Sequence, residues 1–449
     1  MMLDMLRAGV DATHYRREGA PLRQDNQTLL SGTLGLRPEA ANGLRLKHVV
    51  LVWWVVCLIA SPFYVLPSGN PQPADVATAV LILLLLTGYF ARIPLYPTLY
   101  FVAALFLTHV ALVNWFWWTQ IPDPKFLLSS IFYLYDFLVV VVILTLAKEF
   151  GTDFWRFTRI GLVTMLVAEL GVILFLPEFR GIRATGTFNN PNQLGYWSLL
   201  TAACYLSLKG GRGQPSAGLT FFDLGVLGLL GYVSTQSLSK AAMISCAALF
   251  IAAVCLQGAL PRVRFAIAGM LLVGTIVIVD KGADDIQEWF AEGSTKLVMD
   301  RLDDIGRQDD DSWEGRGYDR IWEDPEYLVL GAGEGGVNRF DSPANEIHST
   351  FATVLFSYGI LGLVLFLLLL WLIFRHAELR YFVYFVPICL YGLTHQGLRF
   401  TLLWIFLGLV FARTRYDQPR AVTASHASPN WTAGIGPQPK GRQRPPAVD

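Results

Sequence analysis

Long apolar blocks are the feature that most constrains this chain. About a dozen blocks follow one another between residues 48 and 413. Each is close to the roughly 20 residues that a helix needs to cross about 30 Å of hydrocarbon. Of the 449 residues, 53% are hydrophobic and only 16% are charged, whereas soluble domains carry about 25% charged residues. We therefore predict an all-α polytopic membrane protein with about 12 transmembrane helices.

The predicted spans are separated by stretches rich in proline, glycine and polar residues, which mark turns. They cover residues 48–66, 74–91, 97–118, 126–147, 159–176, 192–208, 220–234, 241–258, 265–280, 349–374, 380–394 and 398–413.

These spans divide the chain into five regions. Residues 1–47 are expected to be a polar N-terminal tail without a cleavable signal, and residues 48–280 carry helices one to nine. Residues 281–347 are polar, acidic and too long for a simple turn, so we predict a cap over the membrane between helices nine and ten. Residues 348–414 carry the last three helices. Residues 415–449, rich in Pro, Ala, Gly and Arg, are expected to be a disordered tail.

The distribution of Lys and Arg predicts the orientation. If the N-terminus is cytoplasmic, the short inner loops hold ten of these residues and the short outer loops hold five, as the positive-inside rule requires. We therefore expect both termini in the cytoplasm and the 281–347 cap outside it. Outer cations do nothing for topology, so we expect them to bind a ligand. They are Lys125, Arg180, Arg183, Lys240 and Arg399.

Several classes of function are not expected. No basic strip with interleaved aromatic residues indicates nucleic acid. The five cysteines lie in apolar runs without a CxxC pair and are expected to be small core residues. The consecutive carboxylates Asp309, Asp310 and Asp311 point in different directions, which favours a solvated loop over a metal site. We expect neither a metal nor a cofactor.

A first candidate site joins the fifth and sixth spans. Asn190-Pro191 predicts a helix start, with Asn as the cap and Pro at the first helical position. The amides of a helix N-terminus favour an anion, and Arg183 a few residues upstream can add paired hydrogen bonds to a phosphate. The alternative is a tight turn whose Arg180 and Arg183 bind lipid headgroups.

A second candidate site lies in the cap. Arg316 and Arg320 are four residues apart, so on a helix they would share one face. The Gly331–Gly336 run that follows has no βαβ unit around it and is not a dinucleotide fingerprint. We expect a flexible turn there.

A third candidate site is where the cap re-enters the membrane, at residues 345–350. Only His348 and His395, among seven histidines, are expected at the outer surface. A histidine there can act as a general base near neutral pH. The alternative is a helix-start histidine with a backbone partner.

Together these stretches resemble the O-antigen ligase and polymerase superfamily, bacterial inner-membrane glycosyltransferases that use undecaprenyl-diphosphate-linked sugars. The resemblance covers about residues 180 to 362. Its pieces are Arg183-Ala184-Thr185-Gly186-Thr187-Phe188 with Asn190-Pro191-Asn192, Ser237-Leu238-Ser239-Lys240, Gly315-Arg316 ahead of Trp322, Leu330-Gly331-Ala332-Gly333, His348-Ser349, and Gly359-Ile360-Leu361-Gly362.

The resemblance implies a metal-independent inverting transfer at the periplasmic face. His348 would take the proton of an acceptor hydroxyl, and the lipid-linked diphosphate would bind Arg183, Arg316, Arg320 and Lys240. Supporting roles would fall to Arg180, Asn192 and Glu346. Lys240 stands where the family usually has Arg, which keeps the charge but loses the bidentate fork. Ser349 stands where Asn often follows the histidine.

Three functions stay open at this point. A polymerase would pass the glycan to another lipid-linked repeat unit, and a ligase would pass it to lipid A core; the acidic cap favours the polymerase slightly. A transporter or flippase of lipid-linked saccharides would share the span count and the cations. Transporters usually carry charges near mid-membrane, however, and here the candidate charges gather at the outer face. The third is a non-catalytic scaffold in polysaccharide export.

Overall fold

The computed structural model describes residues 38–176, 183–210, 218–256, 312–340 and 346–416. Residues 1–46 form a unit by themselves, of which only the first turns of helix α1 are described. The second unit, residues 47–449, contains all the candidate site residues.

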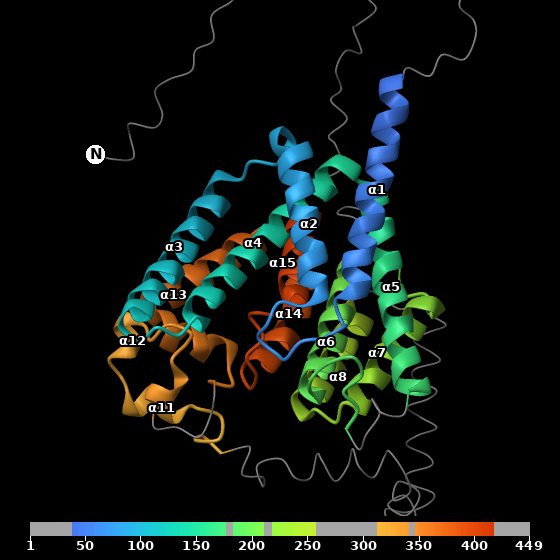
Figure 1. The fold of residues 1–449 in the computed structure, drawn as a ribbon. Helices are drawn as coiled ribbons and strands as arrows, with labels where there is room; N and C mark the ends of the chain where they lie inside the picture. The colour runs from blue at the N-terminus through green and yellow to red at the C-terminus, as the bar shows by residue number, and fades with distance from the viewer. Residues whose placement is uncertain (1–37, 177–182, 211–217, 257–311, 341–345, 417–449) are drawn as a thin grey trace, which may run out of the picture. The chain divides into compact units, whose positions relative to one another are not determined.

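Every regular element in the described ranges is helical, which confirms the all-α prediction (Figure 1). The elements are α1 (Pro38–Ala60), α2 (Pro73–Gly88), η1 (Phe90–Arg92), α3 (Pro97–Gln120), α4 (Lys125–Phe150), α5 (Thr152–Phe175), α6 (Pro191–Ser207), α7 (Phe221–Gln236), α8 (Lys240–Leu256), α11 (Asp319–Glu323), α12 (Tyr327–Leu330), η4 (Val337–Arg339), α13 (Thr350–Phe374), α14 (Leu379–Gly392) and α15 (Thr401–Tyr416).

The predicted spans correspond to these helices. The ninth, residues 265–280, lies outside the described residues, and each of the others coincides with one helix. By length and composition, four helices in the described ranges are long and apolar enough to cross a membrane: α3, α4, α5 and α13. The chain is therefore a helical protein with the character of a membrane protein. The crossing of a membrane by all twelve segments stays a prediction.

Local sequence explains where the helices that carry the candidate sites begin. Asn190 caps α6, its Oδ1 accepting a hydrogen bond from the Gln193 backbone N–H at 2.9 Å, and Pro191 is the first helical residue, as predicted. Ser349 caps α13 in the same way through the Ala352 N–H at 3.3 Å. Two of the three candidate sites therefore end at a capped helix start.

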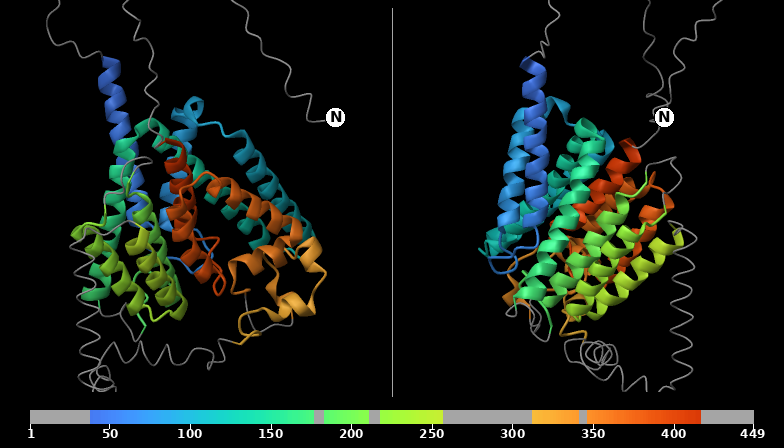
Figure 2. Two further views of the ribbon diagram at one scale, coloured as in Figure 1. Left: turned by 180° about the vertical axis from the view of Figure 1, so that it is seen from behind. Right: turned by 90° about the vertical axis from the view of Figure 1, so that its right-hand side faces the viewer.

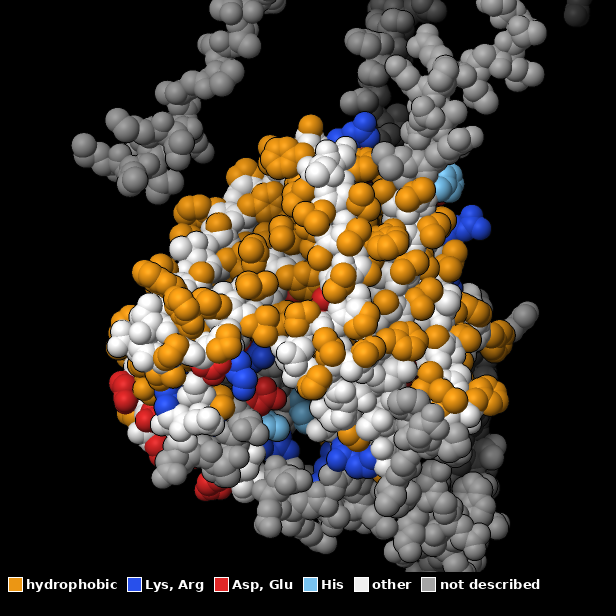
Figure 3. All heavy atoms as spheres, viewed as in Figure 1, with side chains coloured by type: hydrophobic (Ala, Val, Ile, Leu, Met, Phe, Trp, Pro, Cys, Tyr) orange, Lys and Arg blue, Asp and Glu red, His pale blue; other side chains and the backbone are white. Residues whose placement is uncertain are grey.

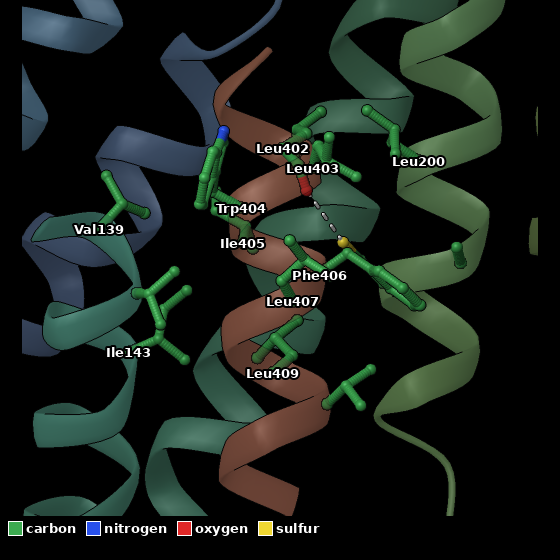
Figure 4. Packing of buried hydrophobic residues seen from close by; sticks show 14 of the residues in the cluster. Val139, Ile143, Leu200, Leu402, Leu403, Trp404, Ile405, Phe406, Leu407 and Leu409 are labelled. Carbon is green, nitrogen blue, oxygen red and sulfur yellow. Dashed lines mark hydrogen bonds between the residues drawn. The ribbon is translucent and has the colours of Figure 1, made fainter. Parts of the chain in front are cut away.

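Helix α15 is buried along most of its length and packs against α4 and α6 (Figure 4). Its residues from Leu402 to Thr414 are all buried. Val139 and Ile143 of α4 approach it from one side, and Leu200 of α6 lies across from them. At 16 residues, or roughly 24 Å, it is shorter than the hydrocarbon layer, and protein surrounds it instead of lipid.

The two ends of the helices differ in charge. One end carries ion pairs of loop cations with carboxylates, such as Arg92 with Glu149 and Arg159 with Asp223. The other end, where α11 and α12 lie, has a hollow ringed by Arg, Lys, Asp, Glu and His side chains, below a broad apolar face (Figure 3). In Figure 2 the light-orange ribbon of α11 and α12 again lies at one end of the helices. The candidate site residues lie at this second end.

Candidate functional site

Two adjoining cavities occupy the end where α6, α13 and α15 begin. The first, which we call the His348 cavity, measures about 220 Å³ and is lined by Asn192, Glu346 and His348 together with residues of the α14–α15 connection. The second, the Arg320 cavity, measures about 500 Å³ and is lined by Arg320 and Glu346 among others. Glu346 and Arg399 line both. Residues from all three candidate sites therefore meet within one region.

A buried carboxylate of α5 anchors the turn that carries Arg183. Glu169 of α5 accepts hydrogen bonds from the Thr187 backbone N–H at 2.9 Å and the Thr187 hydroxyl at 2.7 Å. Gly186 has φ of +55°, and a Cβ there would lie 1.7 Å from the nearer Glu169 oxygen. Only glycine fits this position, which explains the glycine of the Arg183–Phe188 stretch.

Arg183 contacts the His348 cavity only through a residue of the cavity wall. Its Nη2 donates to the Asn192 Oδ1 at 3.0 Å, and its Nε donates to the Ser237 carbonyl oxygen at 3.3 Å. Asn192 lines the cavity, so Arg183 is one residue removed from it. Lys240 begins α8, directly after the turn that Arg183 contacts, and it lines neither cavity. Arg180 lies outside the described residues.

Arg316 and His348 are joined through the backbone. The His348 N–H donates to the Arg316 carbonyl oxygen at 2.9 Å, and the Arg316 Nη1 donates to the Thr394 carbonyl oxygen at 2.9 Å. The Tyr318 hydroxyl reaches the carbonyl oxygens of His348 and Leu393, at 3.2 and 2.6 Å. The cap, the start of α13 and the α14–α15 connection are thus tied together at this point.

The prediction that Arg316 and Arg320 share one helical face is wrong. Helix α11 starts only at Asp319, and Gly317, with φ of +70°, turns the chain between the two arginines. Arg320 is buried, lines the second cavity and lies over the Phe340 ring, with its Cζ 4.9 Å from the ring centroid. Burial lowers the pKa of its guanidinium.

His348 faces a second histidine across the His348 cavity. The ring centroids of His348 and His395 are 6.4 Å apart. His395 stacks on Tyr391 at 4.6 Å, and Tyr391 stacks on Tyr196 at 4.3 Å. The Tyr391 hydroxyl donates to the Asn192 carbonyl oxygen at 3.0 Å. This aromatic column connects the Arg183 turn to the histidines.

The Gly331–Gly336 segment is docked into the helices, so the expectation of a flexible turn is wrong. The N–H groups of Ala332 and Gly333 donate to the carbonyl oxygens of Phe356 and Ser357 in α13, at 2.9 and 2.7 Å. Those carbonyls are free because α13 is kinked at Gly359, where φ is +66° and ψ is −176°. The helix break thus provides the acceptors that the segment needs.

Glu334 and Arg399 form a buried junction between the cavities. Two nitrogens of Arg399, Nε and Nη2, contact the same Glu334 oxygen, at 3.0 and 2.9 Å. The other Glu334 oxygen accepts from the Tyr133 hydroxyl of α4, and the Asn114 side chain of α3 accepts from the Glu334 N–H at 2.9 Å. The sequence marked Arg399 as an outer cation, but no sequence signal pointed to Glu334 or Tyr391.

A metal site is absent from the ranges that the structure describes, where no group of three or more His, Cys, Asp or Glu side chains is arranged to hold an ion. The Asp309–Asp311 run lies outside those ranges. No family model matches the chain, and no curated protein matches it.

Proposed function

We propose that the protein is a membrane glycosyltransferase that moves a glycan from undecaprenyl diphosphate to a saccharide acceptor in O-antigen or exopolysaccharide assembly. One observation carries the proposal. Three stretches far apart in the sequence meet around the His348 cavity, at the end opposite the ion-paired loops. His348 lines it, Arg183 bonds to Asn192 of its wall, and Arg316 bonds to the Thr394 carbonyl oxygen next to His395. A cavity with cations beside it and a histidine in its wall suits a phosphate leaving group and a base.

The proposed reaction is a single displacement. His348 accepts the proton of the acceptor hydroxyl as that oxygen bonds to the anomeric carbon. The bond from this carbon to the diphosphate breaks, the electron pair leaves with the diphosphate, and the configuration inverts. Arg183 and Arg316 stabilise the leaving charge, and each charge-assisted hydrogen bond contributes about 1.5–3 kcal/mol. A positioned base contributes about 10²–10⁴ in rate.

Two substrates require two places to bind, and the adjoining cavities offer them. The His348 cavity extends between α1, α2 and α15 and has apolar walls that include Trp54, Leu58 and Ile405, which suits a lipid-linked donor. The Arg320 cavity is lined by charged groups and suits the acceptor. We favour a repeat-unit acceptor, and therefore a polymerase, over lipid A core.

Deletion of the gene followed by gel analysis of the glycans tests this function. Single-repeat products would support a polymerase, and unmodified lipid A core with accumulated lipid-linked polymer would support a ligase. The His348→Ala variant, expressed in the deletion strain, should insert into the membrane but should not restore glycan transfer. His376→Ala, at the opposite end of α13, is the matched control and should complement fully. Unchanged glycans in the deletion strain would reject the proposal.

A second candidate function, transport of lipid-linked saccharides, is favoured by one residue. Asp136 lies near the middle of α4 and is buried there. Charges within the membrane are typical of transporters. Transport predicts that the His348→Ala variant still delivers lipid-linked saccharides across the membrane, whereas the glycosyltransferase predicts their accumulation on the outer face.

A further inference from the structure

Asp136 is a buried carboxyl group in a helix apolar enough to cross a membrane. It is the twelfth of the 26 residues of α4, roughly 17 Å along the helix from Lys125. Its side chain is 1% exposed, and within the described residues neither of its oxygens has a partner at full hydrogen-bond geometry. Neither the proposed transfer reaction nor the packing of α4 accounts for it.

The surroundings of Asp136 connect it to the His348 cavity. Phe132 and Tyr135, four residues and one residue before it on α4, both line that cavity. Residues at positions i and i+4 share a helical face, so Asp136 lies behind the same wall. Asp75 of α2 and Thr401 of α15 both line the cavity. They are the polar neighbours of the Asp136 carboxyl: Asp75 interacts with it electrostatically, and Thr401 offers it a hydroxyl.

Within the described part of the chain, no cation of the neighbouring helices forms an ion pair with Asp136. Helices α2, α3, α5 and α15 pack against α4. The titratable groups that interact electrostatically with Asp136 are Asp75, Tyr64 and Tyr135. His109 of α3 and Glu169 of α5 bond elsewhere: the His109 Nε2 contacts the Tyr358 carbonyl oxygen at 2.8 Å, and Glu169 binds Thr187. Arg399, two residues before Thr401, is held by Glu334. The nearest charged neighbour is therefore another carboxylate, Asp75.

An ionised carboxylate in such a position is costly, because transferring an uncompensated charge out of water takes far more free energy than a fold can supply. The group must be neutralised by a positive charge, and none of the residues that the structure describes provides one through an ion pair. We propose that Asp136, with Asp75 and Thr401, forms an intramembrane site that takes up one positive charge from the His348 cavity, as a proton or as a small monovalent cation bound by these oxygens.

A hydrophobic carbodiimide tests the site, because it reacts only with protonated carboxyl groups. The acid proton passes to a carbodiimide nitrogen as the carboxyl oxygen bonds to the central carbon. The full-length protein, in native membranes, is treated in mildly acidic to mildly alkaline buffers containing either sodium or choline, and the adduct is located by peptide mass spectrometry. We expect an adduct on Asp136 that is lost in Asp136→Asn.

The conditions that suppress the adduct identify the occupant. Suppression by sodium but not by choline identifies a cation, and suppression by alkaline pH alone identifies a proton.

Glu149 is the internal control. It lies on the same helix but is paired with Arg92 at 3.2 Å, so it should be ionised and stay unlabelled in all of these buffers. The absence of an Asp136 adduct at every pH in choline would overturn the proposal, provided that the denatured protein is labelled at Asp136 in acid strong enough to protonate exposed carboxyl groups. His348→Ala should label like the wild type, so the result is independent of the proposed glycan transfer.

Discussion

Gly186 is the residue on which the shape of the Arg183 turn depends. Its backbone is left-handed, which costs other residues about 1–2 kcal/mol, and the Glu169 carboxylate fills the space that a side chain would need. Gly186→Ala should therefore lower the free energy of unfolding by at least that amount and loosen the Thr187 contacts. Thermal unfolding in detergent measures the change.

Gly171 provides the matched control for this substitution. It is a helical glycine of α5 with open space around its Cα. Gly171→Ala should be neutral or stabilising, by up to about 1 kcal/mol. Equal melting temperatures for the two variants would show that the Glu169 contact does not constrain the turn.

Arg183 differs from a simple positive charge because it uses two nitrogens. Its Nε and Nη2 contact Ser237 and Asn192, a geometry that lysine cannot reproduce. Arg183→Lys should lose about 1.5–3 kcal/mol of transition-state stabilisation, or roughly ten- to hundredfold in kcat/KM for glycan transfer. Arg375→Lys, at the far end of α13, should leave transfer unchanged. Equal activity of the two variants would remove Arg183 from the mechanism.

At the scale of the element, the break in α13 allows hydrogen bonds between two stretches that are separate motifs of the family resemblance, Leu330–Gly333 and Gly359–Gly362. The Leu330–Gly333 stretch supplies the amides, and the helix before Gly359 supplies the carbonyl oxygens. A Cβ on Gly359 would lie 2.3 Å from the Val329 carbonyl oxygen. Gly359→Ala should therefore displace the docked segment and expose its N–H groups.

Hydrogen exchange measures that displacement. Faster exchange is expected at residues 331–336, and glycan transfer should fall with it because Glu334 and Arg399 line the Arg320 cavity. Gly225→Ala on α7, where no atom lies within 4 Å of the added Cβ, should leave the exchange unchanged. Unaltered protection of 331–336 in Gly359→Ala would show that the kink does not hold the segment.

The helices could be predicted from sequence because apolar length and capping residues are local signals: Asn190-Pro191 marked α6 within a residue. The convergence of Arg183, Arg316 and His348 was expected only through a family resemblance. Contacts between segments far apart in the chain could not be predicted, because no local sequence signal specifies them. Nothing around Glu334 indicates that a helix break 25 residues later would fix its loop, and the Arg316–Arg320 spacing misled because Gly317 interrupts the helix. Asp136, inside a predicted span, was overlooked because its effect depends on what surrounds it.

At the scale of the whole molecule, the distribution of cations predicts which end faces the cytoplasm. Arg92, Lys148 and Arg375 belong to the end with the ion-paired loops, whereas His348 and the exposed Glu326 belong to the other. The positive-inside rule predicts that the first end is cytoplasmic and that the candidate site faces the periplasm. In a background whose five cysteines are replaced by serine, a membrane-impermeant maleimide should label Glu326→Cys in intact spheroplasts. It should label Arg375→Cys only after the membrane is permeabilised. These two positions flank α13, so labelling of both from one side would show that α13 does not cross the membrane. Labelling of Arg375→Cys alone in intact spheroplasts would show the opposite topology. The site would then face the cytoplasm, where no periplasmic acceptor could reach it.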